Sequence, residues 1–408
     1  MNIKKILKKE AENVKPDKET TVKLARLASE IKAEIEKSLK KKKIRADVFL
    51  GGSYAKGTII RKKGYDIDIY VRFDKKEMEI DKKLASLIRG EKIHGSRDYL
   101  RIKRQGVVFE IIPVVKISRA EEAENVTDLS FFHVNYIRKC IKKLRLEDEI
   151  RLTKAFCYSN EVYGAESYIK GFSGYALELL ICHYKSFLRF IKEAAEKESI
   201  IIDSEKLYKN KNDILSSMNE SKMQSPIILV DPTFRQRNAL AALSRETYEK
   251  FREACRQFLK NPKSSFFEMK EFDVDSFKRG RGEFVKLAIE TNKQAGDIAG
   301  SKLLKFFNMM KKHIDVGFKI LKEKFIYDDN KRAEVYLILE RRKEIILSGP
   351  PITNVENVVK FKNRHKNCYL KDQRVYAREK AKSWKDFFKE FKEKNKISIR
   401  EMGIIKIN

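Results

Sequence analysis

Apolar side chains recur at helix and strand spacing along the first part of the chain. Between residues 19 and 39 they return every three or four positions, which predicts a helix: Leu24, Leu27, Ile31, Ile35 and Leu39. Residues 65–73 and 107–115 instead alternate apolar and polar positions, which is typical of half-buried strands. A shorter apolar stretch at 46–50 predicts a strand that leads into Gly51, Gly52 and Ser53.

The pattern changes to helical spacing from about residue 129, and helices are predicted at 149–160, 174–194 and 245–259. Ser173 and Ser244 are suited to cap the second and third of these. From about residue 264, strand-like runs (284–289, 335–339, 345–347) mix with helical ones (303–325, 355–363, 384–394). We therefore predict an α+β protein with a head containing a mixed β-sheet at 1–128, a helical domain at 129–262 and a C-terminal α+β region at 263–408.

Size and charge narrow the class of protein. A chain of 408 residues that is 42% hydrophobic can bury a core and should form two or three domains. The 90 Lys and Arg residues against 59 Asp and Glu give a net charge of +31, which favours a polyanionic partner, nucleic acid first. The alternative is a compositional bias toward lysine. An anionic membrane surface is disfavoured, because no basic amphipathic stretch carries an isolated apolar face.

Targeting and cysteine patterns exclude other classes. No apolar run reaches the ~18 residues needed to span a bilayer, and the N-terminal segment lacks the apolar core of a signal peptide. We therefore expect a soluble, cytoplasmic protein with no membrane partner. The five cysteines are scattered, with no Cys-x-x-Cys pair and no histidine at ligand spacing, so we expect neither a zinc site nor a disulfide framework.

Acidic residues on the two predicted strands indicate a metal site. Asp66 and Asp68 are two positions apart, so both carboxylates leave the same face of one strand. Carboxylate oxygens at this spacing suit Mg²⁺, and Glu110 on the second strand is a candidate third ligand for a two-metal site. The preceding Gly51-Gly52-Ser53 permits a tight turn and close backbone approach to a polyphosphate. The turn, the paired acids and the third acid each have an ordinary structural explanation when taken alone. Their order along the chain is what indicates a function.

In this order, the turn, the paired acids and the distal acid resemble the DNA polymerase β nucleotidyltransferase superfamily. Seven blocks narrow the resemblance to class I, archaeal-type CCA-adding tRNA nucleotidyltransferases: GSYAKGT (52–58), YDIDIYVRF (65–73), FEIIPVVKI (109–117), FFHVNYI (131–137), RLTKAF (151–156), VYGAESYIKGFSGYALELL (162–180) and VDPTFRQRN (230–238). A weaker resemblance continues through GPPITNVENVVKFKNRHKN and RVYAREKAKSW, so that it covers nearly the whole chain.

The resemblance implies a nucleotidyltransferase head and template-independent addition or repair of the 3′-terminal CCA of tRNA, from CTP and ATP with release of pyrophosphate. It implies that the catalytic, metal-binding carboxylates are Asp66, Asp68 and Glu110, with Glu110 acting on the primer hydroxyl as metal ligand or general base. It implies nucleotide-binding residues as follows: Gly52, Ser53, Lys56, His133, Lys154, Tyr163 and Arg237. Partners would be the 3′ end and acceptor and elbow regions of tRNA, and a homodimer is compatible with the family.

Three of these residues have a structural alternative. Lys154 could be a solvated lysine on the surface of its helix. His133 could be a hydrogen-bonded structural histidine, and Arg237 a salt-bridged arginine at a helix start, instead of the arginine that contacts the base. The sequence also departs from the close archaeal pattern. Asp66 stands where Glu is commoner, Glu110 where Asp is commoner, and Lys56 where Arg is expected.

Other functions stay open on the residues alone. They are addition of only CC or only A, another superfamily activity such as a poly(A) polymerase or oligoadenylate synthase, and a catalytically silent RNA-binding protein. In the C-terminal region three basic clusters, 278–281, 341–343 and the pair Arg374 and Arg378 around Tyr376, are candidates for phosphate contacts. We expect them to recognise a folded RNA by shape and backbone.

Overall fold

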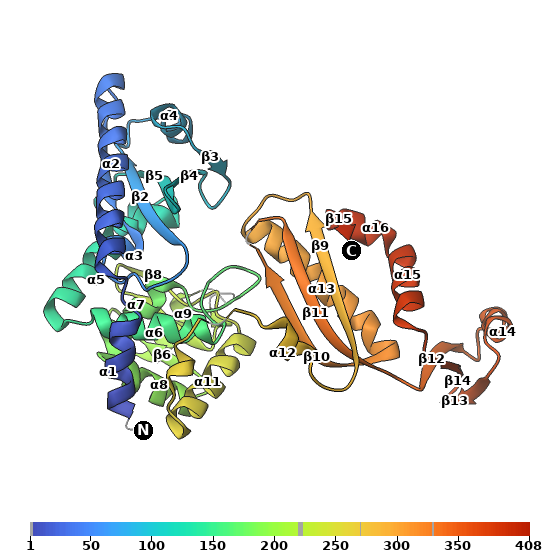
Figure 1. The fold of residues 1–408 in the computed structure, drawn as a ribbon. Coiled ribbons are helices and arrows are strands. Elements are labelled where there is room, and N and C mark those ends of the chain that lie inside the picture. Colours follow the sequence, from blue (N-terminus) through green and yellow to red (C-terminus); the bar gives the residue numbers. More distant parts are fainter. Residues whose placement is uncertain (1–2, 219–222, 270, 329) are drawn as a thin grey trace. The chain divides into compact units, whose positions relative to one another are not determined.

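The computed structural model describes residues 3–218, 223–269, 271–328 and 330–408. It divides into two compact units, Met1–Lys270 and Glu271–Asn408 (Figure 1), which are described separately. The fold class is the predicted mixture of helices and mixed sheets. The predicted domain boundaries at 128 and 262 stay predictions. Among the described residues, none of the helices has the length and apolarity needed to cross a bilayer.

The first unit begins with a mixed five-stranded sheet in the order β1-β2-β5-β4-β3. Its strands are β1 (Ala46–Leu50), β2 (Tyr65–Phe73), β3 (Glu91–Ile93), β4 (Tyr99–Arg104) and β5 (Val107–Val115). The central pair, β2 and β5, runs parallel, and the other pairs are antiparallel. The predicted strands at 46–50, 65–73 and 107–115 are confirmed at both ends.

Helix α2 (Lys18–Lys42) covers one face of this sheet (Figure 1) and confirms the helix predicted at 19–39. The apolar side chains of α2 are buried in one cluster with the inward side chains of β2. These β2 residues are 0% exposed: Ile67, Ile69, Val71 and Phe73. The other helices of this part are α3 (Gly52–Ala55) and α4 (Ile80–Leu87). Because β2 buries one face, its alternate residues must leave the opposite face, and these include Asp66 and Asp68.

A second apolar cluster, rich in phenylalanine, joins the helices of residues 130–260. They are α5 (Ser130–Leu144), α6 (Glu147–Ser159), α7 (Gly174–Tyr184), α8 (Phe187–Glu196) and α11 (Arg245–Lys260), with α9 (Lys211–Ser217) nearby in sequence, and α1 (Ile3–Asn13) contributes Ile6. Ser173 and Ser244 cap α7 and α11 as predicted. The single helix predicted at 174–194 is wrong: Lys185 is left-handed (φ 59°) and Ser186 is extended, so two helices form.

This helical part also holds a small sheet that the hydrophobic pattern did not predict, in the order β6-β7-β8. Its strands are β6 (Ile200–Ile202), β7 (Ile227–Asp231) and β8 (Phe234–Asn238). The block VDPTFRQRN therefore forms a strand, a turn and a strand. Arg237 lies on β8, which corrects the alternative that assigned it to a helix start.

The second unit contains two sheets. The larger, β10-β11-β9-β15, carries α13 (Asp297–Gly317) across one face (Figure 1) and comprises β9 (Glu283–Thr291), β10 (Phe318–Tyr327), β11 (Arg332–Arg341) and β15 (Ile404–Ile407). The smaller, β12-β14-β13, comprises β12 (Glu344–Pro351), β13 (Cys368–Lys371) and β14 (Arg374–Lys380). The remaining helices are α12 (Val274–Lys278), α14 (Val355–Arg364), α15 (Trp384–Lys394) and α16 (Lys396–Glu401).

The helix predicted at 303–325 is confirmed as far as Gly317 and wrong from residue 318 onward. Helix α13 ends at Gly317, and the next residues form β10, which pairs antiparallel with β11 over its length. Residues 318–327 contain apolar positions at both helix and strand spacing, so pairing with β11 rather than local preference decides their conformation.

The cysteine prediction also needs one correction. Cys140 of α5 and Cys182 of α7 form a disulfide, with their Cα atoms 6.3 Å apart. The two helices pack on each other, which brings together residues 42 positions apart in sequence. Neither residue lies in a recognisable spacing motif, so only the packing of the helices reveals the pair.

Candidate active site

A turn between β1 and α3 brings the backbone against the acidic face of β2. The Gly51 N–H donates to the carbonyl of Asp68 at 2.8 Å, and Gly52 is left-handed with φ +57°. A Cβ added at Gly51 would lie 2.2 Å from the Tyr70 ring, and one at Gly52 would lie 1.6 Å from Asp68 Oδ2. Gly52 is therefore required by its closeness to Asp68 and by its backbone angle, and Gly51 by its closeness to the Tyr70 ring.

The three acids occupy neighbouring strands. Asp66 and Asp68 share one face of β2, and Glu110 of β5 stands directly opposite Asp68 in the parallel register. Burial, together with the negative charges of Glu110 and Asp66, raises the pKa of Asp68 to about 7. Two flanking acids already have partners: Asp66 pairs with Lys62, and Glu110 accepts a hydrogen bond from Arg101 at 3.1 Å.

This arrangement fits a divalent cation through its donors and charge. Within the described part of the chain, no three Asp, Glu, His or Cys side chains gather closely enough to hold one ion. However, Asp68 lies beside the negative charges of Asp66 and Glu110, which outweigh those of the nearby lysines and which a dication would neutralise. All three candidate ligands are hard oxygen donors. Asp66 and Glu110 would have to exchange Lys62 and Arg101 for the ion.

Beside these acids lies a cavity of about 240 Å³. It is lined by residues from α3, β2, α5, α6, α7 and the segments just after α3 and α6: Gly52, Ser53, Lys56, Asp66, Asp68, Tyr70, Ser130, His133, Val134, Lys154, Tyr163, Gly174, Tyr175 and Glu178. All the predicted site residues therefore meet at this one cavity except two. Glu110 lies beside Asp68 on the next strand, and Arg237 connects to the cavity through Asp231.

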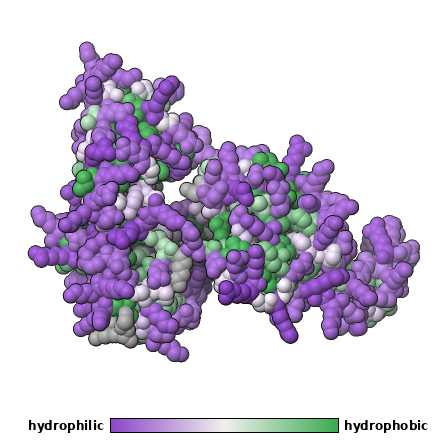
Figure 2. Space-filling model, viewed as in Figure 1, coloured by the Kyte–Doolittle hydropathy of each residue, from purple (hydrophilic) through white to green (hydrophobic). Residues whose placement is uncertain are grey.

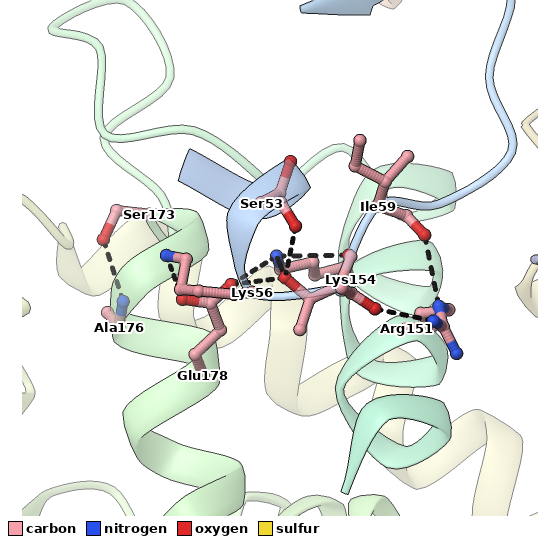
Figure 3. Close-up of polar contacts among 10 residues, drawn as sticks. Ser53, Lys56, Ile59, Arg151, Lys154, Ser173, Ala176 and Glu178 are labelled. Carbon is pink, nitrogen blue, oxygen red and sulfur yellow. Dashed lines mark hydrogen bonds and ion pairs between the residues drawn. The ribbon is translucent and has the colours of Figure 1, made fainter. Parts of the chain in front are cut away.

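In one wall of the cavity, two buried lysine side chains pair with the same carboxylate. Glu178 Oε2 accepts from Lys56 at 2.5 Å, and its Oε1 accepts from Lys154 at 2.7 Å and from Thr58 at 2.6 Å. Figure 3 shows both lysines directed toward Glu178. Nearby, Arg151 donates to the carbonyls of Gly57 and Ile59, so the chain that follows α3 is held against α6.

Next to this wall, where Lys56 lies over the Tyr175 ring, a buried carboxylate organises a group of aromatic rings. Asp231 accepts from Arg237 at 2.6 Å and from the Tyr175 hydroxyl at 3.0 Å, and His133 Nε2 lies 3.2 Å from it. The His133 ring stacks on Tyr175 with centroids 4.1 Å apart. Burial opposes the charged form of Asp231, but the neighbouring His133 and the charge of Arg237 outweigh it and lower the pKa of Asp231. Arg237 thus is salt-bridged, as its structural alternative supposed, but on a strand beside the cavity.

Several residues of this site were not singled out from the sequence: Glu178, Asp231 and Tyr175. Each lies inside a block that was quoted for the resemblance, but none was assigned a role. The sequence could have pointed to Glu178, because it is a lone acid among the apolar residues of α7. A charge at a buried position needs partners.

The basic clusters of the second unit are partly structural. Arg341 Nε donates to the carbonyl of Ala381, Arg342 to that of Asp315 and Arg374 to that of Gly349. Arg378 instead stacks over Tyr369, with its guanidinium 5.2 Å from the ring centroid. The face shown in Figure 2 is largely hydrophilic, in keeping with the high charge of the chain.

The chain resembles known proteins along most of its length. Residues 148–268 match the family model "tRNA nucleotidyltransferase, second domain", and residues 1–129 match the model of the "Second Messenger Oligonucleotide or Dinucleotide Synthetase domain". A CCA-adding enzyme of Nanoarchaeum equitans is 33% identical over 81% of this chain and 83% of its own length. That of Methanocaldococcus jannaschii is 31% identical over 92% of this chain and 87% of its own.

Solved structures with a similar fold include a cytoplasmic RNA terminal U-transferase. It superposes with a TM-score of 0.51 at 13% identity, covering 66% of this chain and 98% of its own. At that identity the likeness shows a shared nucleotidyltransferase fold and nothing further.

Proposed function

Because the chain belongs to the family of CCA-adding enzymes, which are tRNA nucleotidyltransferases, we propose that the cavity beside the Gly51–Ser53 turn is its active site. Its activity is template-independent addition of CCA to the 3′ end of tRNA. The observation that carries the assignment is the meeting of paired acids, a left-handed glycine turn and two lysines at one cavity.

In the proposed reaction, the 3′-hydroxyl oxygen of the RNA attacks the α-phosphorus of CTP or ATP. A new phosphodiester P–O bond forms, the bond to the bridging oxygen breaks, and pyrophosphate leaves. The hydroxyl proton goes to a carboxylate, for which Glu110 is our candidate. Lys56 and Lys154 face the cavity from the turn and from α6, and their charges suit the triphosphate as negative charge accumulates on the leaving group.

Enzymes of this kind depend on divalent metal ions, and we propose that Asp66, Asp68 and Glu110 hold Mg²⁺ here. When bound, such ions activate the attacking hydroxyl and stabilise the leaving pyrophosphate. The chain itself places three carboxylates on adjacent strands. Without a cation, this arrangement disfavours the charged form of Asp68. Gly52 of the turn lines the cavity beside these acids.

We propose that Arg237 and Asp231 form the base-recognition side of the cavity. Asp231 holds the guanidinium of Arg237 in a fixed direction, and the stacked rings of His133 and Tyr175 offer a flat apolar surface next to it. A planar guanidinium with several donors suits the acceptors on the Watson–Crick edge of cytosine and adenine.

The corresponding prediction is that Arg237→Gln lowers kcat/KM for CTP and ATP by about 10- to 100-fold, because a charged hydrogen bond to the base is lost. Selectivity against UTP should fall with it. Arg235→Gln is the matched control, since Arg235 is an exposed arginine two residues earlier on β8. Unchanged CTP and UTP kinetics in Arg237→Gln would contradict the role, as would an equal loss in Arg235→Gln.

The partners we propose are CTP, ATP and the 3′ end and elbow region of tRNA, with phosphate contacts from the basic residues of both units. If these contacts dominate affinity, tRNA binding should weaken by about 10³-fold or more between 50 and 200 mM salt. Fluorescence anisotropy with labelled tRNA measures this slope, and circular dichroism at each salt concentration checks that the fold is unchanged. A flat dependence would mean that the net charge of +31 is mostly compositional. A homodimer and a cytoplasmic location stay predictions.

The decisive experiment is extension of a tRNA that ends at its discriminator base. Each NTP is supplied alone, and then CTP and ATP are supplied together, with and without a metal chelator. We expect two additions with CTP, a third only when ATP is also present, and none with chelator. An open-ended run of one base would point to a polymerase, stopping after CC to a partial enzyme, and tRNA binding without extension to a silent RNA-binding protein.

A further inference from the structure

The carboxylate of Glu178 is the shared acceptor of three groups from two distant segments. Lys56 and Thr58 come from the chain after the glycine turn, about 120 residues away in sequence, and Lys154 comes from α6. Glu178 is 0% exposed and Lys154 only 2%. Thr58 completes the network, because its hydroxyl donates to Glu178 and accepts from Lys154 at 2.9 Å.

A buried acid on α7 is not needed for packing. Its neighbours on the helix are apolar and buried, namely Ala176, Leu177, Leu179, Leu180 and Ile181. An apolar residue of similar volume would fill the same space without the cost of removing a charge from water, and such replacements are often neutral or stabilising. The buried charge therefore calls for an explanation in the chemistry of the cavity that it lines.

The charges around Lys154 supply that explanation. It faces Glu178 from α7, Lys56 from the end of α3 and Lys62 from the following loop, and it lines the cavity together with Tyr163. Burial lowers the pKa of Lys154, the charges of Lys56 and Lys62 lower it further, and Glu178 is the group that opposes them. Burial of Glu178 is outweighed by Lys154 and Lys56, which lower the pKa of Glu178 to about 2.

We propose that Glu178 is a positioning residue for nucleotidyl transfer: it keeps the ammonium group of Lys154 charged inside the protein and holds Lys154 and Lys56 at the wall where the triphosphate binds. It acts through the two lysines and does not touch the substrate. This inference rests on the proposed function, since it takes the anion in the cavity to be the triphosphate of CTP or ATP.

The test is Glu178→Gln, which keeps the size of the side chain and removes its charge. Lys154 should then lose its proton at lower pH, so we expect the alkaline limb of the pH profile of kcat/KM for CTP to move down by about one pH unit or more. KM for CTP at neutral pH should rise by about tenfold. Glu178→Asp keeps the charge on a shorter side chain, so it should leave the limb within about 0.3 units of wild type while KM rises severalfold.

Glu149→Gln is the matched control. Glu149 is a carboxylate of α6 that accepts the N–H of Phe187 at the start of α8, and it is absent from the cavity lining. Its loss should lower the melting temperature and leave the pH profile where it was. A purely structural role for Glu178 would make its Gln variant behave in the same way.

The outcomes separate the two proposals. A folded Glu178→Gln variant with the wild-type alkaline limb and KM overturns the role of Glu178, while CMP transfer by wild type still supports the proposed function. Wild-type protein that transfers no nucleotide to tRNA overturns the proposed function itself. If Glu178→Gln does not fold, Glu178→Asp tests the role of Glu178 instead. An unchanged KM for CTP in Glu178→Asp overturns the inference.

Discussion

Replacing Asp68 with asparagine is expected to reduce nucleotidyl transfer by at least about 10³-fold while making the metal-free protein more stable. The loss of activity follows because a neutral amide cannot serve as an anionic metal ligand between Asp66 and Glu110. The gain in stability follows from the raised pKa. The folded protein binds the Asp68 proton up to about pH 7, because its pKa is raised, whereas the unfolded chain releases it near the ordinary aspartate pKa of 3.8.

The sign of this effect can be worked out directly. Between those two pKa values the folded state holds more protons than the unfolded state, so the contribution of Asp68 to stability falls as pH rises from about 4 to 7. At pH 8 the Asp68 carboxylate is charged and its full destabilising effect is present. Asparagine carries no charge, so the variant does not have this effect. The folded and unfolded pKa values differ by roughly three pH units at about 1.4 kcal/mol each, so we expect a gain of a few kcal/mol and a rise of several degrees in the melting temperature of the first unit.

Single-turnover CMP addition and thermal unfolding at pH 8, each with and without Mg²⁺, measure the two effects. Mg²⁺ should raise the melting temperature of wild type and have little effect on Asp68→Asn. Asp74→Asn is the control, because Asp74 follows the end of β2 and accepts the N–H of Lys76 in the next turn. An Asp68→Asn variant that keeps a tenth of the wild-type rate would contradict the assignment of this carboxylate.

The second large effect is expected from Gly52→Ala, which should lower transfer by about 10²-fold or more. Alanine can adopt φ +57° at a cost of about 1 kcal/mol, but its Cβ would lie 1.6 Å from Asp68 Oδ2. The carboxylate must therefore turn away from the position that we propose for metal binding. The fold should survive, since the end of a side chain moves and no backbone contact is broken.

Gly57→Ala provides a matched comparison. Gly57 is also left-handed, at φ +67°, but a Cβ added there meets no heavy atom within 4 Å. Both variants should thus lose a similar small amount of stability, and only Gly52→Ala should lose most of its activity. Metal-dependent CMP transfer and thermal unfolding of the two variants decide the matter. Equal activity in both would show that Asp68 tolerates displacement.

Much of the fold could be predicted from local patterns. Strands β1, β2 and β5 were predicted to the residue, because one face of the sheet is buried and period-two alternation is then enforced. Helices α2, α11 and α15 followed from apolar spacing, and α11 also from its capping residue Ser244. The failures occurred where the local signal was ambiguous, as at residues 318–325, or short, as in β6, β7 and β8.

Some features of the candidate site could likewise be predicted from local sequence, and others could not. The sequence by itself determined that Asp66 and Asp68 share a face and that a glycine turn precedes them, since both facts depend on residues close together in the chain. Only the tertiary structure decided that Glu178 holds Lys56 and Lys154, that Asp231 orients Arg237 and that Cys140 meets Cys182. These partners come from separate elements, and the burial that makes each pairing necessary arises only when the helices and sheets pack together.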